Sequence, residues 1–405
     1  MLTSDFEPHE LKASGDPFVI RWLCLGLIFF GSERGVPGVE GERVTNQVAK
    51  VAAPTPLAAV LSPEKWQQVE QAVDRALSWM ASQQAADGSF PTLPSGQPAV
   101  TSLSVMAFLS RGHQPGIGPY GKRINSAIDF VLSCQLPNGL ISLQTSDLTD
   151  PLQTAEYAAV YNHAISGLML GEVYGQVSGP RAKAVKHAIE QALQFSRHLQ
   201  LRPKPADEKG GWRYTRVLDS GASDLSVTGW QLMFMRSAKN AEFDVPQAYV
   251  DEAITYVRRL WDPRSGLFYY KRVGGIGAKA SRGMVGAGIL SLSMAGEHQS
   301  SMARAAGDWL LAHPYKAFGE RIGEADQFFY STYYCSQAMA QLGGRYWEQF
   351  FPPLAKILLT SQRANGSWPL EVDAGGEAVF GHVYTTAMAV LSLTPPYQLL
   401  PVYQR

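Results

Sequence analysis

The chain has 405 residues, with 35 Lys or Arg against 35 Asp or Glu, so its formal net charge at pH 7 is zero. Because no overall field attracts nucleic acid or an anionic membrane surface, and only 17% of the residues are charged, we expect an apolar or neutral partner. The three cysteines, Cys24, Cys134 and Cys335, are too few for a disulfide framework or a cysteine-based zinc knuckle.

An apolar run lies near the N-terminus at residues 18–30, which read FVIRWLCLGLIFF. Its length matches the apolar part of a secretory signal and is short for an ordinary membrane span. Arg21 would be its basic flank, whereas Asp5 and Glu7 upstream are unusual in front of a signal. We therefore expect the protein to be exported or held at a membrane by this run, with a cytoplasmic protein as the alternative.

The next stretch, residues 31–60, is rich in Gly, Val, Ala and Pro and lacks a helical period, which is typical of a linker. We therefore divide the chain into an N-terminal segment with its linker, residues 1–61, and a domain at residues 62–405. A closed array of repeats can grow beyond the usual limit of a single core, so we expect one domain here.

Six times in this domain an apolar helical stretch runs into a glycine-centred turn and a second apolar stretch follows. The turns are centred on Gly88, Gly139, Gly211, Gly266, Gly319 and Gly366. Successive turns are 47 to 72 residues apart, which suits a unit of two helices joined by a long loop.

The first repeat illustrates the pattern. Ser62 and Pro63 predict a helix start, after which apolar residues recur on one face from Trp66 onward. Residues 100–109 follow the turn, and their apolar side chains nearly encircle the predicted helix. The first helix of each pair is therefore predicted to be amphipathic and outer, and the second to be buried and inner.

The later pairs are predicted at 124–135 with 154–170, 185–199 with 224–238, 249–261 with 282–295, 302–312 with 330–342, and 351–362 with 383–393. Six such pairs can close into an all-α toroid, with a ring of inner helices around a central cavity and a ring of outer helices outside. An open superhelix is the alternative, but it needs polar capping repeats, and the last segment, residues 395–403, stays apolar.

Three turns share one spacing of Gln, Gly and an apolar residue. They are Gln84-x3-Gly88-x-Phe90, Gln135-x3-Gly139-x-Ile141 and Gln362-x3-Gly366-x-Trp368. This pattern resembles the QW repeat of squalene and oxidosqualene cyclases, and the domain is similar to the squalene cyclase and prenyltransferase superfamily of α/α toroids. The resemblance implies that the Gln and aromatic side chains tie each outer helix to the next. It also implies an isoprenoid-type apolar substrate that is bound or transformed in the central cavity.

The acid of a triterpene cyclase is the first site that the resemblance directs us to seek. Those enzymes protonate an alkene with a D-x-D-D-T motif, in which carboxyl partners stabilise the conjugate base. This chain has no D-x-D-D, and Asp224, at the head of the third inner helix, is the candidate catalytic acid without acidic neighbours. If the protein is an enzyme, it would be a cyclase-like isomerase or transferase with a non-standard acid. The alternative interpretation of Asp224 is a helix N-cap.

The prenyltransferase resemblance implies a zinc site of Asp, Cys and His, for which Asp326, Cys335 and His382 are the candidates. The first two are nine residues apart, whereas the family places them two apart, so we expect neither a metal nor another cofactor. Lys279 and Arg282 could face a phosphate group, or they could be solvated rim residues.

Polar and aromatic residues on the predicted inner helices are the remaining candidates for substrate binding. They are Glu156, Tyr157, Tyr161, Asn162 and His163 on the second, Tyr330, Tyr333 and Tyr334 on the fifth, and His382 and Tyr384 on the sixth. Aromatic faces suit a polyisoprenoid chain, although each such residue could equally be ordinary core, and His163 a hydrogen-bonded buried side chain.

The sequence leaves three functions open. The first is an isoprenoid-handling protein, and the second is a non-catalytic toroid that serves as a scaffold for lipid or protein. The third is a carbohydrate-active α/α barrel with two facing carboxylates, against which the Q-x3-G-x-W turns argue. The oligomeric state is not indicated.

Overall fold

The computed structural model describes residues 56–143, 155–215, 223–271, 280–323, 325–371 and 377–404. All of them belong to one compact unit, Ala53–Arg405. The apolar run at 18–30 and Lys279 lie outside the described residues, so the expectations for them stay predictions. Glu156 and Tyr157 lie in the first turn of a helix, but their side chains are outside the described part.

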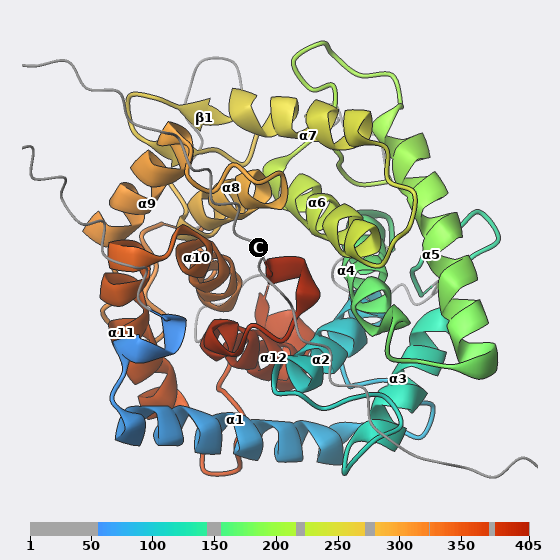
Figure 1. The fold of residues 1–405 in the computed structure, drawn as a ribbon, viewed down its shortest axis with the longest axis horizontal. Helices are drawn as coiled ribbons and strands as arrows, with labels where there is room; N and C mark the ends of the chain where they lie inside the picture. The colour runs from blue at the N-terminus through green and yellow to red at the C-terminus, as the bar shows by residue number, and fades with distance from the viewer. Residues whose placement is uncertain are drawn as a thin grey trace, which may run out of the picture. The chain divides into compact units, whose positions relative to one another are not determined.

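Twelve α-helices in the described residues form two concentric rings, as Figure 1 shows. The outer helices are α1 (Pro63–Gln83), α3 (Gly121–Ser133), α5 (Gly179–Gln200), α7 (Gln247–Arg259), α9 (Ser301–Ala312) and α11 (Gly344–Ser361). The inner helices are α2 (Ala99–Ser110), α4 (Ala155–Tyr174), α6 (Leu225–Asn240), α8 (Arg282–Met294), α10 (Phe328–Leu342) and α12 (Gly381–Leu393). The predicted all-α toroid of six helix pairs is confirmed.

In their described parts, the connections contain only short elements. The strands β1 (Trp261–Asp262) and β2 (Leu267–Phe268) form an antiparallel hairpin. The 3₁₀ helices are η1 (Leu57–Val60), η2 (Pro94–Gly96), η3 (Glu377–Phe380), η4 (Pro395–Tyr397) and η5 (Pro401–Tyr403). η1 lies within the predicted linker, and it packs on α11, where the Trp347 indole donates to the Leu57 carbonyl oxygen at 2.8 Å.

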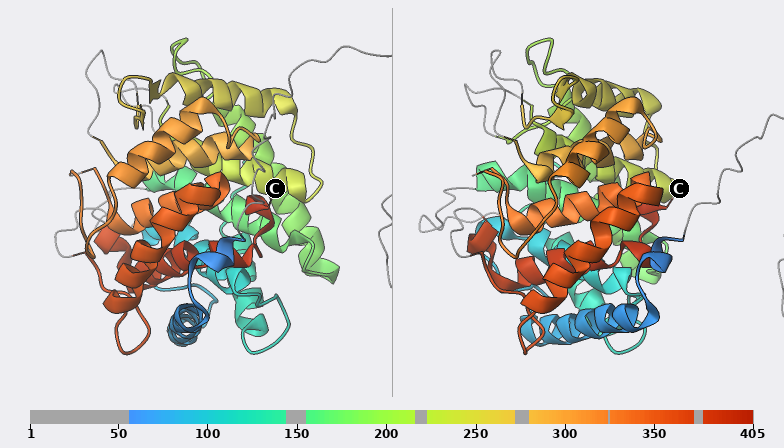
Figure 2. Two further views of the ribbon diagram at one scale, coloured as in Figure 1. Left: turned by 60° about the vertical axis from the view of Figure 1, so that its left-hand side comes forward. Right: turned by 90° about the vertical axis from the view of Figure 1, so that its left-hand side faces the viewer.

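The ring is closed. Each inner helix contacts the next, from α2 through α12, and α12 returns to contact α2. In the outer ring α1 contacts α11, and Figure 2 shows the first helix in blue beside the last outer helix in orange-red. The first and last repeats therefore meet, which excludes the open superhelix.

The two rings differ in burial because their sequences differ in pattern. Every residue of α2 and α8 is buried, whereas α1 buries one face and exposes the other. Small residues let the inner helices approach closely: a Cβ on Gly286 would lie 2.8 Å from the Cys335 backbone nitrogen. Among the described residues, no helix combines the length and apolar character that a membrane span requires.

Four turns carry a bridge in which a Gln side-chain amide donates to its own turn and to the next outer helix. The bridges are Gln84 to the carbonyl oxygens of Gly88 and Arg123, Gln135 to Gly139 and Ala188, Gln200 to Gly210 and Tyr249, and Gln362 to Gly366 and Ala72. Their N···O distances lie between 2.8 and 3.3 Å. The structural role predicted for Gln84, Gln135 and Gln362 is therefore confirmed.

The third turn corrects the sequence analysis in one respect. The glycine with a left-handed backbone is Gly210, with φ of 94°, and not Gly211. A Cβ on Gly210 would lie 2.0 Å from the carbonyl oxygen of Glu252, so only glycine allows α7 to approach this closely. Its glutamine, Gln200, is ten residues upstream instead of four, and the spacing rule therefore missed it.

A second anchor ties each of these turns to its own inner helix. The backbone N–H two residues after the glycine donates to a threonine hydroxyl in three of the turns, at 3.0 to 3.1 Å. The pairs are Phe90 with Thr101, Trp212 with Thr228, and Trp368 with Thr386. In the second turn His163 replaces the threonine: its Nδ1 accepts from the Ile141 N–H at 3.2 Å.

The C-terminal residues lie across one end of the ring, at its centre in Figure 1. The Val402 N–H donates to the Glu172 carboxylate at 3.3 Å, and the Gln341 amide donates to the Tyr403 carbonyl oxygen at 2.6 Å. Glu172 and Gln341 belong to the last turns of α4 and α10. The C-terminal segment therefore covers the carboxyl ends of the inner helices, and the opposite end of the ring holds the cavity described next.

Candidate functional site: a central cavity with a tyrosine cluster

A cavity of about 550 Å³ lies inside the inner ring, at the amino ends of its helices. Its lining comprises Ser95, Gly96, Ala99, Val100, Leu103, Ala158, Tyr161, Asn162, Ile165, Tyr214, Ser226, Trp230, Tyr270, Met284, Ala325, Gln327, Tyr330, Phe380 and Tyr384. These residues are apolar, aromatic or neutral polar, and none of them carries a charge.

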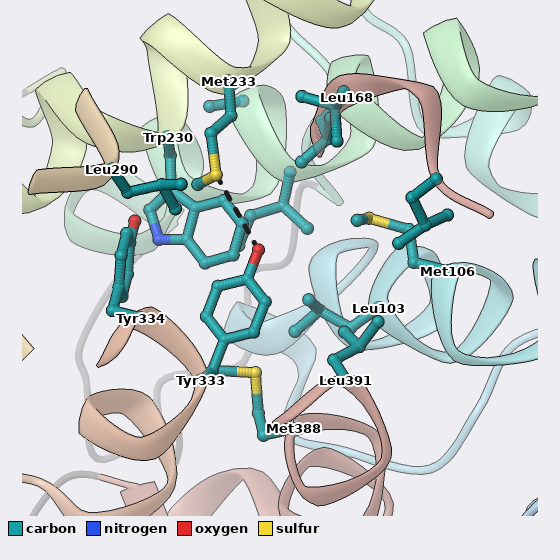
Figure 3. Close-up of a cluster of buried hydrophobic side chains, with 14 of the residues drawn as sticks. Leu103, Met106, Leu168, Trp230, Met233, Leu290, Tyr333, Tyr334, Met388 and Leu391 are labelled. Atoms are coloured by element: carbon teal, nitrogen blue, oxygen red, sulfur yellow. Dashed lines mark hydrogen bonds between the residues drawn. The ribbon is translucent and has the colours of Figure 1, made fainter. Parts of the chain in front are cut away.

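Packed side chains from all six inner helices fill the ring beneath the cavity, as Figure 3 shows. Those labelled are Leu103, Met106, Leu168, Trp230, Met233, Leu290, Tyr333, Tyr334, Met388 and Leu391. Trp230 lines the cavity and stacks on Tyr333, with ring centroids 5.4 Å apart. The Tyr333 hydroxyl contacts the Met233 sulfur at 3.8 Å. These side chains form the floor of the cavity.

Five hydroxyl groups meet at one side of the cavity, and we call them the tyrosine cluster: Tyr161, Tyr214, Ser226, Tyr270 and Tyr330. The Tyr161 hydroxyl donates to the Ser226 hydroxyl at 2.9 Å, and Ser226 and Tyr330 share a hydrogen bond of 2.6 Å. The Tyr214 and Tyr270 hydroxyls are 2.8 Å apart. Burial and the nearby carboxylate of Asp224 raise the pKa of Tyr161, Tyr214 and Tyr270, which are therefore neutral phenols.

Asp224 lies behind this cluster and is fully buried. Its Oδ1 accepts from the Val227 N–H at 2.8 Å, as an N-cap does, and its Oδ2 accepts from the Tyr270 hydroxyl at 3.1 Å. Arg213 Nε lies 3.6 Å from the same Oδ2. Burial raises the pKa of Asp224 to about 7, against the opposing effects of the Val227 N–H and the Arg213 charge. The carboxylate does not line the cavity, and Tyr270 stands between the two.

Four of the predicted binding residues line the cavity: Tyr161, Asn162, Tyr330 and Tyr384. Asn162 also holds the wall together, because its side chain accepts from the Ala99 N–H at 3.2 Å and donates to the Ser95 carbonyl oxygen at 2.9 Å. Tyr333 and Tyr334 belong instead to the packed floor, where both are fully buried.

His163 does not line the cavity. Its Nδ1 accepts from Ile141, so the proton is on Nε2, which lies 3.0 Å from the Ser196 hydroxyl. Burial lowers the pKa of His163 to about 3, so the ring is neutral at physiological pH. A helix turns by about 100° per residue, and this places Asn162 toward the cavity and His163 toward the outer ring.

Arg282 is also absent from the lining, because a buried ion pair holds it in the wall. Its Nε donates to Asp326 Oδ2 at 2.8 Å, its backbone N–H donates to Oδ1 of the same carboxylate, and its guanidinium lies over the Tyr315 ring. With its charge compensated in this way, Arg282 is not placed to hold a phosphate in the cavity.

The candidate metal ligands do not come together. Asp326 is engaged by Arg282, the Cys335 thiol donates to the Arg282 carbonyl oxygen at 3.2 Å, and His382 Nδ1 lies 3.0 Å from the Trp368 carbonyl oxygen. His382 is half-buried beside the last turn and does not line the cavity. Within the described ranges, no group of three His, Cys, Asp or Glu side chains is placed to bind a metal ion.

The sequence analysis missed Tyr214 and Tyr270, which join the cavity to Asp224. Each lies four residues after a turn glycine, Gly210 or Gly266, and two residues after a buried aromatic. Because these segments are extended, residues two apart point to the same side, here toward the ring interior. Aligning the turns and asking which carry an aromatic at this position would have identified both tyrosines.

No protein-family model matches the chain, and no curated protein matches its sequence. Solved structures of similar fold include a protein from Actinoplanes, with a TM-score of 0.52 and 16% identity over 81% of this chain and 99% of that one. The type II terpene cyclase MstE from Scytonema has a TM-score of 0.50 and 13% identity over 84% of this chain and 100% of its own. The GH76 α-mannanase BT2949 of Bacteroides thetaiotaomicron has a TM-score of 0.56 and 11% identity over 85% and 98%.

These neighbours include both a terpene cyclase and a mannanase, and each is less than a fifth identical to this chain. At such identities a structural likeness establishes a shared fold and leaves the substrate open. The resemblance drawn from the QW-type turns therefore holds at the level of the α/α toroid.

Proposed function

We propose that the central cavity binds an apolar, isoprenoid-type molecule. The observation that carries this proposal is a cavity of about 550 Å³ whose described lining is uncharged and mainly apolar or aromatic. Small-molecule sites typically enclose about 300–1,000 Å³ and combine an apolar wall with a few convergent polar groups. The aromatic faces of Trp230, Phe380 and Tyr384 suit a branched, unsaturated hydrocarbon chain.

The structural neighbours support this proposal in part. The Scytonema cyclase structure contains geranylgeranyl dihydroxybenzoate as substrate, so a toroid of this architecture accommodates a prenylated molecule. The mannanase neighbour supports the alternative of glycoside chemistry, which requires two carboxyl groups roughly 5 to 10 Å apart. The described lining supplies no carboxylate, and the buried Asp326 and Glu371 are bonded to Arg282 and Arg321. We therefore favour the isoprenoid.

Binding is better supported than cyclisation. Protonation of an alkene requires a very strong acid, whereas Asp224, with a pKa of about 7, is a weak one and is shielded from the cavity by Tyr270. We therefore propose a binding protein in which Asp224 does not protonate the hydrocarbon. The alternative is a toroid that serves as a scaffold for another protein, with its cavity unused.

Native mass spectrometry of the full chain, followed by organic extraction, tests the proposal. We expect a retained polyprenyl molecule, or uptake of added geranylgeraniol. Ala158→Trp should lower the occupancy because Ala158 lines the cavity, whereas Ala184→Trp should not, because Ala184 is exposed on α5. Absence of a retained lipid together with failure to take up the alcohol would overturn the proposal in favour of the scaffold.

A further inference from the structure

The tyrosine cluster contains a chain of hydrogen bonds whose direction is set at one end. The Tyr270 hydroxyl donates its only hydrogen to Asp224 Oδ2. The hydrogen bond of 2.8 Å between Tyr214 and Tyr270 must therefore be donated by Tyr214. As long as Asp224 is an acceptor, both phenol hydrogens point toward it and away from the ligand space.

Above its pKa of about 7, Asp224 is ionised and its Oδ2 can only accept. Val227 offers a backbone N–H, which can only donate, so Oδ1 must accept. The guanidinium of Arg213, 3.6 Å from Oδ2, favours the ionised carboxylate. Oδ2 therefore determines the direction of the hydrogen bonds that run from Tyr214 through Tyr270 to Asp224. Tyr214 lies at the other end of this series, so a ligand in the cavity would meet the result at its hydroxyl.

A ligand at this wall faces a phenol oxygen whose hydrogen is already donated. Such an oxygen can accept a hydrogen bond but cannot give one, which suits a ligand that carries a donor. A diphosphate offers acceptors and negative charge, and burying it requires cations, of which the described lining contains none. A hydroxyl group both donates and accepts, and the adjacent Ser226 and Tyr330 hydroxyls can serve it as well.

We propose that the tyrosine cluster binds the hydroxyl end of a prenyl alcohol, and that Asp224 is a positioning residue that acts through Tyr270 to orient the hydroxyls. This inference rests on the proposed function, because it names the class of isoprenoid that the cavity takes. It assigns Tyr214 as the acceptor that selects an alcohol, and it excludes a diphosphate as the preferred ligand.

Asp224→Asn is the informative variant, since asparagine caps a helix about as well as aspartate. Its amide oxygen can keep the bond from Val227, and its amide nitrogen then takes the place of Oδ2 and donates to Tyr270. The hydrogen bonds then run in the opposite direction, from residue 224 to Tyr270 and from Tyr270 to Tyr214, and Tyr214 becomes a donor toward the cavity. We expect the wild-type protein to bind geranylgeraniol about five- to tenfold more tightly than its methyl ether, which lacks the donor. In Asp224→Asn the preference should vanish or reverse.

Tyr270→Phe tests the same idea in a second way. It removes the hydroxyl that links Tyr214 to Asp224 and leaves the N-cap bond between Asp224 and Val227 in place. It should also reduce the preference for the alcohol to about one. Tyr174→Phe is the matched control, because Tyr174 packs on Phe243 at the carboxyl end of α4 and does not line the cavity. It should leave the preference unchanged.

The titrations would be carried out above pH 8, where Asp224 is ionised, with geranylgeraniol, its methyl ether and geranylgeranyl diphosphate. Equal wild-type affinity for alcohol and ether, an unchanged preference in both variants, or tightest binding of the diphosphate would overturn this inference while leaving the proposed function standing. Failure of all three molecules to bind would overturn both.

Discussion

The side-chain amide of Gln362 donates to the carbonyl oxygen of Ala72 at 2.8 Å, which joins the last outer helix to the first. The same nitrogen donates to the Gly366 carbonyl oxygen at 2.9 Å, so one side chain holds both its own turn and the neighbouring helix. The three other glutamine bridges make the same pair of contacts, which means that the closing junction is built like the internal ones.

This equivalence predicts the effect of removing a bridge. Gln362→Ala should lower the free energy of unfolding by about 1–3 kcal/mol, because it leaves partly buried carbonyl oxygens without their donor. Gln84→Ala should cost about as much, since a closed ring has no terminal junction. Denaturant unfolding measures both, with Gln247→Ala as the control, because Gln247 bonds only an exposed Asp251 on its own helix. A negligible loss for Gln362→Ala beside a large one for Gln84→Ala would indicate an open array.

The glycines beneath the bridges predict a second effect. A Cβ on Gly366 would lie 2.5 Å from the Arg75 carbonyl oxygen, and its φ is 94°. Gly366→Ala should therefore lower the free energy of unfolding by about 2–5 kcal/mol, from left-handed strain plus displacement of α1. Gly118 has a φ of 69° and nothing near its Cβ position, so Gly118→Ala should cost only about 1–2 kcal/mol. Thermal and denaturant unfolding would measure both variants. If Gly366→Ala and Gly118→Ala lose the same free energy of unfolding, then the left-handed backbone conformation alone matters at Gly366, and the contact with Arg75 does not.

The ring could be predicted from the sequence because its causes are local. Outer helices have one apolar and one polar face, inner helices are apolar on all sides, and a glycine lies in the turn between them. The periodicity of apolar residues therefore predicts the six pairs. Helix ends were less accurate: α11 begins at Gly344, before the predicted residue 351, and contains Pro352 and Pro353. Prolines predict a helix start, and here the packing of α11 on its neighbours outweighs that signal.

The site was harder to predict because its contacts join distant residues. The sequence predicted that Asp224 lies at the start of a helix. It did not predict the hydrogen bond from Tyr270, which shields Asp224 from the cavity, because the two residues are 46 apart in sequence and lie on separate loops. Likewise, the sequence suggested a phosphate ligand or a solvated rim residue at Arg282, and neither matches its buried ion pair, because the partner Asp326 is 44 residues away. A single sequence shows which residues share a helix face, whereas pairings between loops depend on how the ring closes.

His163 predicts a loss of stability in acid. Its pKa is about 3 in the folded protein, below the usual 6.5, because burial disfavours the charged ring. Between these values the unfolded chain binds a proton that the folded protein does not, so the free energy of unfolding falls by about 1.4 kcal/mol for each pH unit below about 6. His163→Asn, which retains an acceptor for Ile141, should flatten this dependence between pH 5 and 6.5, although it costs stability at pH 7.

The control for this experiment is His187→Asn, because His187 is exposed on α5. It should leave the slope of the unfolding free energy against pH as it is in the wild type. If the slope is the same in His163→Asn as in the wild type, then His163 is protonated in the folded protein, and its role as a neutral anchor of the second turn is wrong.

Glu172 predicts a pH dependence of opposite sign at the other end of the ring. Burial raises its pKa to about 7 from the usual 4.5, so between these values the folded protein holds a proton that the unfolded chain has lost. The free energy of unfolding should therefore fall as pH rises through this window, by about 3–4 kcal/mol in total. Glu172→Gln removes the titration and can keep both contacts: its oxygen accepts from Val402, and its nitrogen donates to Ser237, whose hydroxyl also reaches the Leu168 carbonyl oxygen.

We therefore expect Glu172→Gln to be more stable than the wild type at pH 8 and about equally stable at pH 5, as measured by urea unfolding at both values. Glu348→Gln, at an exposed position on α11, should match the wild type throughout. A Glu172→Gln variant that is destabilised at pH 8 would mean that the ionised carboxylate holds the C-terminal segment, since only a charged acceptor would then bind the Val402 N–H strongly enough to offset its burial.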